Sequence, residues 1–174
     1  RFSMSMMYEL PFGKGKMLLS DANGVVDRIV GGWQFGAVYA FQTGFPIGFG
    51  NLFYNGGDIS IDPSQRNISG WFNTSVFTTA TALQPASNLR TFAPRYTDVR
   101  RDNINNLDVS LKKDIRLRET MKIQIRFELI NALNEPYFPA PSTAIGGTFG
   151  TISNATANQD NYARRAQFGI KFLF

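Results

Sequence analysis

The strongest pattern in the sequence is a strict alternation of apolar and polar positions over residues 121–131. A period of two predicts a β-strand with one apolar and one polar face. The apolar face would carry Met121, Ile123, Ile125, Phe127 and Leu129, and the polar face Lys122, Gln124, Arg126 and Glu128. The segment has the length of roughly 9 to 11 residues that a strand needs to cross a bilayer. A half-buried strand of a soluble protein would alternate in the same way, so this segment alone does not separate the two.

Four further segments repeat the pattern, and they cover residues 2–10, 33–42, 107–117 and 164–174. Their expected apolar sets are Phe2, Met4, Met6, Tyr8 and Leu10; Trp33, Phe35, Ala37, Tyr39 and Phe41; Leu107, Val109, Leu111, Ile115 and Leu117; and Ala166, Phe168, Ile170, Phe172 and Phe174. Lys113 interrupts the third set near its end, where a long side chain can reach the bilayer interface. Only residues 118–120 separate two of the segments, which predicts a hairpin with a short turn.

An uncharged run over residues 29–57 could also suggest a membrane-spanning helix. Glycines at 31, 32, 36, 44, 48 and 50, together with Pro46, disfavour a helix there. The aromatic residues of the run recur at every second position, as in a strand, and not at every third or fourth. We therefore expect a strand over 33–42 followed by a loop.

The connections between the expected strands differ greatly in length. Long ones cover residues 44–106 and 134–162, whereas shorter ones cover 11–29 and 118–120. In bacterial outer-membrane barrels the periplasmic turns are short, the extracellular loops are long and the C-terminus is periplasmic. Counting back from Phe174 places 118–120 and 11–29 on the periplasmic side and the long connections outside.

These observations predict an all-β fold, namely an antiparallel transmembrane β-barrel segment within one domain over residues 1–174. Five strands cannot close a barrel, because bacterial single-chain barrels begin at about eight strands. The sequence starts at Arg1 without an initiator Met or an export signal. We therefore expect the chain to be the C-terminal part of a longer protein, with further strands before Arg1.

Composition narrows the functional classes. Aromatic residues make up 14% of the chain and charged residues only 18%, which suits a β-structure with an apolar outer face. Cys and His are both absent, so thiol nucleophiles, the usual general bases and most transition-metal ligands are missing. We expect no enzyme activity, no catalytic residue, no metal site and no cofactor.

The net charge of +5 does not indicate nucleic-acid binding, because the basic residues are scattered along the alternating strands. We expect the charges on the polar faces to point into the barrel lumen, most of them in structural ion pairs. This lumen-facing set comprises Asp108, Lys112, Lys122, Arg126, Glu128, Arg165 and Lys171.

Other candidate motifs are weak. Residues 13–16 read Gly-Lys-Gly-Lys but lack the spacing and the hydroxyl residue of a phosphate-binding loop. Asp58 and Asp62 have too few oxygen ligands nearby for Ca²⁺. In the long loop, Trp71, Phe72 and Phe77 could stack on a ligand, although such residues more often pack a small loop core.

The last strand ends on Phe174, with apolar residues at alternate positions before it: Phe168, Ile170 and Phe172. This pattern resembles the signal by which the outer-membrane barrel assembly machinery recognises its substrates. Such a strand offers an edge for β-augmentation and apolar side chains for specificity.

Several further motifs, in this order, resemble the C-terminal barrel of TonB-dependent receptors, particularly the large type with an N-terminal carboxypeptidase-regulatory-like domain. They lie at residues 9–15, 31–34, 42–46, 70–77, 105–113, 127–138, 149–152 and 164–171. The resemblance implies a barrel of about 22 strands, an N-terminal plug, and a TonB box that couples the receptor to the inner-membrane motor. It implies energised uptake of a ligand, such as a siderophore, a cofactor or a glycan.

Two alternatives stay open at this point. A passive or structural barrel, porin-like or adhesin-like, would share the strands but not the plug and TonB box. A soluble all-β binding domain such as a lectin-like sandwich would also alternate, but it should carry polar residues on some outer faces. The expected partners of the favoured reading are outer-membrane lipid, the assembly machinery, the TonB complex and an unidentified ligand.

Overall fold

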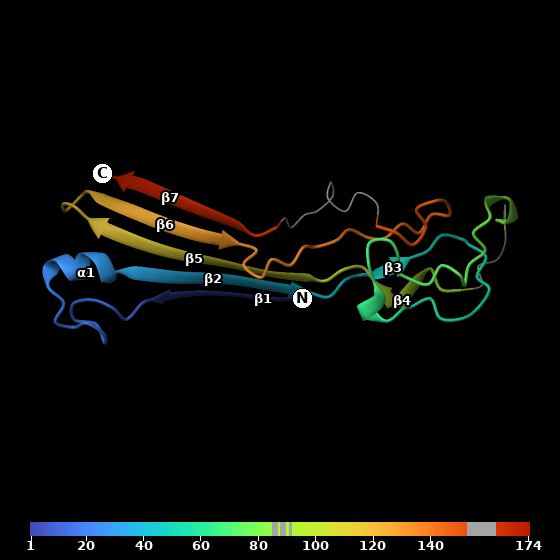
Figure 1. Ribbon diagram of the computed structural model, residues 1–174, viewed down its shortest axis with the longest axis horizontal. Coiled ribbons are helices and arrows are strands. Elements are labelled where there is room, and N and C mark those ends of the chain that lie inside the picture. The colour runs from blue at the N-terminus through green and yellow to red at the C-terminus, as the bar shows by residue number, and fades with distance from the viewer. Residues whose placement is uncertain (85–86, 88–89, 91, 153–162) are drawn as a thin grey trace. The chain divides into compact units, whose positions relative to one another are not determined.

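The computed structural model of the protein describes every residue except 85, 86, 88, 89, 91 and 153–162. Its chain divides into two compact units, which we describe separately (Figure 1). The first, the sheet unit, comprises Arg1–Gln42, Asn105–Glu135 and Tyr162–Phe174, and the second, the loop unit, comprises Thr43–Ile104 and Pro136–Asn161. Within the described residues, no helix is long and apolar enough to cross a membrane.

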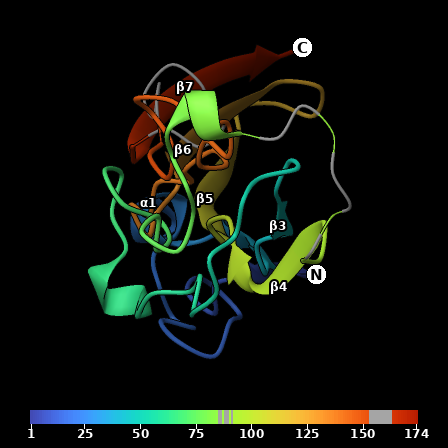
Figure 2. The same cartoon turned by 90° about the vertical axis from the view of Figure 1, so that its right-hand side faces the viewer.

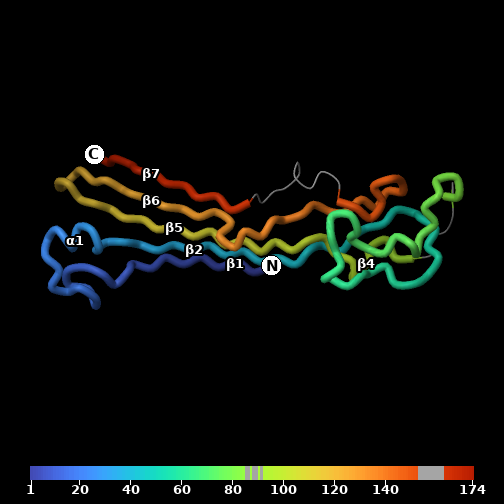
Figure 3. Tube along the Cα trace, viewed as in Figure 1, coloured from blue at the N-terminus to red at the C-terminus, as the bar shows by residue number. Residues whose placement is uncertain are grey.

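The sheet unit is built on a five-stranded sheet in the order β1-β2-β5-β6-β7, which Figure 3 shows as neighbouring tubes. The strands are β1 (Phe2–Glu9), β2 (Trp33–Gln42), β5 (Ile104–Arg116), β6 (Lys122–Ile130) and β7 (Arg165–Leu173). The pairs β1–β2, β5–β6 and β6–β7 are antiparallel. This confirms the expected antiparallel fold and places a strand in each of the alternating segments.

The register brings the expected apolar sets onto a single face of the sheet. Met4 pairs with Tyr39 across β1 and β2. Phe127 of β6 pairs with Leu111 on one side and with Phe168 on the other. Since directly opposed residues point to the same side, the apolar residues of neighbouring strands form one continuous surface. We call it the outward face, and the opposite, more polar side the inward face.

The strand ends differ from the expected ones where turns take over. Leu117 and Met121 were expected in strands but lie in the β5–β6 turn, where the Leu117 amide donates to the Met121 carbonyl over 2.9 Å. Tight closure of a hairpin removes the flanking residues from the ladder although their side chains still fit the alternation. At the other end, β5 begins at Ile104, earlier than its apolar pattern predicts.

A left-handed turn ends β6. Asn131 has a φ of 52° and Asn134 a φ of 56°, a region that Asn tolerates better than most residues. The Asn131 side chain is fully buried; its carbonyl oxygen accepts from the Glu135 amide over 3.1 Å, and its amide group donates to the Glu135 carbonyl. This asparagine therefore fixes the exit of the chain from the sheet.

A short helix, α1 (Gly24–Val30), lies in the connection that was expected to be a loop. Asn23 caps its first turn by accepting hydrogen bonds from the amides of Val25 and Val26. The preceding turn is locked against the helix, because the Lys14 amide donates to the Asp27 carboxylate over 2.6 Å. A Cβ on Gly13 would lie 2.9 Å from the Gly31 Cα, so both glycines allow a close approach of two backbone segments.

The loop unit has a hydrophobic core of its own, which the sequence did not predict as a unit. The unit contains β3 (Pro46–Gly48) paired antiparallel with β4 (Arg95–Arg100), both labelled in Figure 2, and the short 3-10 helices η1 (Pro63–Gln65) and η2 (Thr81–Leu83). The buried residues of this core are Ile47, Phe49, Leu52, Ile59, Trp71, Phe72, Val76, Phe77, Val99, Phe149 and Ile152. Residues from both parts of the unit contribute, so the two connections fold together.

Candidate functional site

The outward face is the first functional surface of the sheet unit. Its large side chains are exposed in this chain, as shown by fractions of 44% for Phe127, 64% for Phe168 and 67% for Phe172. A continuous exposed apolar surface of this kind needs an apolar partner, because leaving it in water costs roughly 25 cal/mol for each Å². Lipid is the partner that matches a surface spread over all five strands.

The C-terminal residues proposed as an assembly signal all lie on this outward side or at its end. Phe168, Ile170 and Phe172 point outward from β7, and Phe174 follows the strand with 97% of its surface exposed. β7 pairs with β6 only, within the order of the described sheet. The structure thus presents these side chains beside a strand edge, and their role as an assembly signal stays a prediction.

The expected interruption at Lys113 is a structured site. Lys113 is only 4% exposed, although it belongs to the outward face. Its ammonium group donates to the carbonyl of Ile29 over 3.0 Å and to that of Gly31, and it lies 5.2 Å from the centre of the Trp33 ring. The α1 C-terminus and an aromatic face therefore satisfy a cation that would otherwise meet lipid.

All seven charges expected to face the lumen belong to the inward face, since none shares the parity of the apolar sets. Lys112 lies opposite Arg126, Lys171 opposite Gln124 and Arg165 opposite Ile130. On this face Lys122 forms an ion pair with Asp114 at 3.3 Å, and Arg126 forms one with Glu128 at 3.4 Å. The sequence predicted that most of these seven charges form structural ion pairs, and the structure shows such pairs at Lys122, Arg126 and Glu128.

Asp108 has a different role from the other charges. Its carboxylate accepts a hydrogen bond from the Asn131 amide over 2.9 Å. It thereby ties β5 to the left-handed turn that ends β6. Asp114, which the sequence placed on the polar face without singling it out, accepts both from Lys122 and from Gln124. Asp114 of β5 is therefore a carboxylate that accepts from two side chains of β6 on the inward face.

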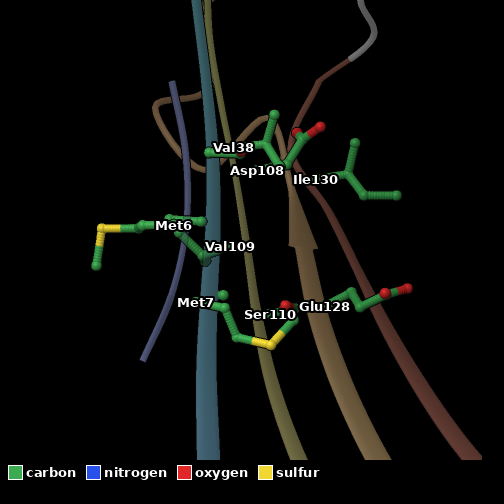
Figure 4. Close-up of a pocket in the computed structure, with 11 residues that line it drawn as sticks. Met6, Met7, Val38, Asp108, Val109, Ser110, Glu128 and Ile130 are labelled. Carbon is green, nitrogen blue, oxygen red and sulfur yellow. The ribbon is translucent and has the colours of Figure 1, made fainter. Parts of the chain in front are cut away.

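A hollow of about 480 Å³ lies on the sheet where β1, β2, β5 and β6 adjoin. Figure 4 shows Met6 pointing to the side of β1 opposite to Met7, as alternation requires. The inward side chains that line the hollow combine apolar groups with two carboxylates, namely Met7, Val38, Asp108, Ser110, Glu128 and Ile130. Such a surface can contact an amphiphilic molecule or segment.

Gly36 shapes the floor of this hollow and was not singled out from the sequence. A Cβ at this position would lie 2.6 Å from the Ser110 hydroxyl. Its paired residue on the neighbouring strand β1 is Met7, which has a long flexible side chain. The signal that could have found it is a glycine inside an otherwise aromatic strand, which often marks a close approach.

The aromatic residues of the long loop pack together. Trp71, Phe72 and Phe77 are all buried, and the rings of Phe72 and Phe77 are 6.4 Å apart in an edge-to-face arrangement. The Trp71 indole donates to the Arg100 carbonyl over 2.7 Å. Phe49 and Phe149 extend the cluster. These contacts favour the packing alternative over ligand stacking for these three residues.

The carboxylates of the loop unit serve local turns. Asp58 accepts from the Ser60 amide and hydroxyl, and Asp62 accepts from the same two groups of Ser64. The hydrogen bonds from Ser64 lower the pKa of Asp62 below its ordinary value. Among the residues that the structure describes, no group of His, Cys, Asp or Glu is arranged to hold a metal ion.

Comparison with known protein families gives one match. The model of a family described as an outer membrane beta barrel domain matches residues 1–167 of the chain. No match was found in a search of curated proteins or in a search of solved structures.

Proposed function

The chain belongs to the family of outer membrane β-barrel domains, and from this premise we propose that it forms part of the wall of a TonB-dependent receptor that imports a ligand. The family and the antiparallel sheet place the protein in the bacterial outer membrane. A soluble lectin-like sandwich is therefore wrong. The rival that stays in contention is a passive or structural barrel.

The observation that favours a plugged receptor is the arrangement of cations on the inward face. Lys112 lies directly opposite Arg126, and Arg116 opposite Lys122. Like charges at directly opposed positions destabilise a sheet. Asp114 pairs with Lys122 and Glu128 with Arg126, so each of these opposed cation pairs has one neighbouring carboxylate. A folded segment in the lumen that carries acidic groups would stabilise the cations.

The inward face also supports transport by its mixed character. The hollow beside Met7 and Val38 is mainly apolar, whereas Asp108 and Glu128 border it. A water-filled pore has little need of apolar side chains on its wall. A receptor whose lumen holds a plug needs both kinds of contact, because the plug must be held and must also move.

The test that needs no knowledge of the ligand is the conductance of the full-length protein in a planar lipid bilayer. A plugged receptor should conduct little at first and should open when urea on the periplasmic side unfolds the plug. Closure after removal of urea would support a plug that refolds in place. A large conductance from the moment of insertion would overturn the proposal in favour of a passive barrel.

Coupling to TonB requires a second measurement. The purified periplasmic domain of TonB should bind the full-length protein in detergent, as followed by titration calorimetry. Absence of binding, combined with a urea-sensitive plug, would leave a gated barrel without energised uptake. The two experiments therefore separate the plug from the motor.

A further inference from the structure

We propose that α1 and the turn before it bind the phospholipid of the periplasmic leaflet, as an interfacial anchor on the outside of the barrel. The proposal rests on the location of α1, on the side chains it exposes, and on the charges around it. It does not depend on transport, since a passive barrel could carry the same anchor.

The C-terminal end of α1 lies on the outward side of the sheet. Trp33 and Lys113 both belong to this face. The Trp33 indole donates to the Ile29 carbonyl over 3.0 Å, and Lys113 donates to the carbonyls of Ile29 and Gly31. The C-terminal end of α1 is thus held by two side chains that project toward lipid and not toward the lumen.

We infer that α1 lies at the height of the periplasmic headgroups. It precedes the start of β2 and contacts Lys113, which lies close to the end of β5. The short turn after β5 marks this end of the sheet as periplasmic. Figure 1 shows α1 at the same end of the sheet as the C-terminus. Trp and Lys are the residues that typically lie at the interface between apolar core and headgroups.

The helix α1 exposes apolar side chains. Val25 is 71% exposed and Ile29 65% exposed, four positions apart on one side of the helix. Met17 and Leu19 of the preceding turn are exposed as well. The acidic residue of the helix, Asp27, is directed to the Lys14 amide instead. An apolar side and a satisfied carboxylate suit a short helix at a lipid surface.

The segment that contains α1 also carries exposed basic residues. Lys14 and Arg28 are exposed in the same segment, whereas Lys16 pairs with Glu9 at 3.0 Å. Basic groups near an apolar patch attract anionic phospholipid headgroups. The patch also continues the lipid-contacting outward face at Trp33. A phospholipid leaflet therefore fits both the charge and the setting better than a periplasmic protein.

The experiment places a spin label at Ile29 of the full-length protein, by Ile29→Cys in a background without other cysteines. Vesicles of phosphatidylethanolamine and phosphatidylglycerol provide the leaflet. Collisions with oxygen, which concentrates in lipid, are compared with collisions with a water-soluble nickel chelate. The matched control is Asp21→Cys, an exposed polar position of the same connection.

We expect the ratio of oxygen to nickel collisions to be severalfold higher at position 29 than at position 21. Equal, water-like ratios would overturn the proposal. Shielding of position 29 from both reagents would also overturn it, because the helix would then be covered by protein. Faster migration of the unboiled protein on a gel checks that each variant folds, and Val25→Cys replaces Ile29→Cys if that variant fails this check.

Discussion

Lys113 and Trp33 meet at the end of the outward face next to α1, where the ammonium group lies 5.2 Å from the centre of the indole ring. Both side chains also donate to the Ile29 carbonyl. One backbone oxygen thus joins two neighbouring strands to α1. The pair turns a position that should repel lipid into an attachment point for the turn between β1 and β2.

Lys113→Ala should therefore destabilise the protein. It removes hydrogen bonds from a charged donor to two carbonyls, so we expect the free energy of unfolding to fall by about 2 kcal/mol. Urea titration of the detergent-folded protein measures the change. Lys112→Ala is the matched control, because Lys112 is adjacent to Lys113 in the sequence but projects to the inward face, opposite Arg126. Equal losses from both variants would contradict the role given to the outward cation.

Phe127→Arg should impair assembly far more than Arg126→Ala. Phe127 lies between Leu111 and Phe168 on the outward face, and an arginine near the bilayer midplane costs roughly 2 to 4 kcal/mol. Arg126 lies on the inward face, where alanine loses one ion pair with Glu128. The yield of heat-modifiable protein in the outer-membrane fraction measures assembly. Similar yields of the two variants would count against the assignment of faces.

Asn131→Ala should loosen the end of β6. Alanine disfavours the left-handed backbone at φ 52° and removes both side-chain contacts with Glu135. In the same urea titration, we expect the free energy of unfolding to fall by about 2 kcal/mol, mostly because the buried hydrogen bonds are lost. Asn131→Gly keeps the backbone conformation and loses only the side chain, so its loss should be smaller. If glycine were the more harmful substitution, the turn conformation would not be the constraint.

Gly44→Ala should disturb the loop unit without affecting the strands of the barrel. An added Cβ would overlap the backbone oxygen of Arg101, which cannot rotate away as a side chain can. Overpacking of this kind costs about 1 to 3 kcal/mol. The expected result is faster cleavage of the loops by protease in intact cells. Gly50→Ala, which meets no atom within 4 Å, should leave the cleavage rate unchanged.

Phe77→Ala should also expose the loop unit to protease. The Phe77 ring is 5.4 Å from that of Phe49 and 5.5 Å from that of Phe149, and loss of a buried phenylalanine costs about 3 to 5 kcal/mol. Phe53→Ala is the control, since Phe53 is an exposed residue of the same unit. A protease pattern unchanged by Phe77→Ala would favour a ligand-binding role for this aromatic residue.

The strands were predictable because each strand faces lipid on one side and the lumen on the other. A wall between lipid and lumen forces each residue to one side, so alternation over residues such as Ile123, Gln124 and Ile125 reports the strand directly. The turn was predicted at residues 118–120, but its extension to Leu117 and Met121 was missed, because both side chains still obey the alternation. Helix α1 was missed although its cap residue, Asn23, and the acidic Asp27 of its first turn were visible signals.

The core of the loop unit could not be found by pattern. Phe49, Phe77 and Phe149 lie far apart in sequence and show no period, yet their rings pack together. Only their tertiary contacts decide between packing and ligand contact. The same holds for Asp108, whose charge suggested a lumen position but whose carboxylate closes a turn. Pairwise contacts of this kind leave no trace in local sequence.

The separate core of the loop unit has an evolutionary consequence. Its interior is sealed by its own aromatic residues, so exposed positions such as Phe53, Ile68 and Leu83 contribute little to folding. Connecting segments also tolerate more sequence variation than the elements they connect. Substitutions can therefore accumulate on this surface, while the outward residues of the strands stay under the stricter constraint that the bilayer imposes.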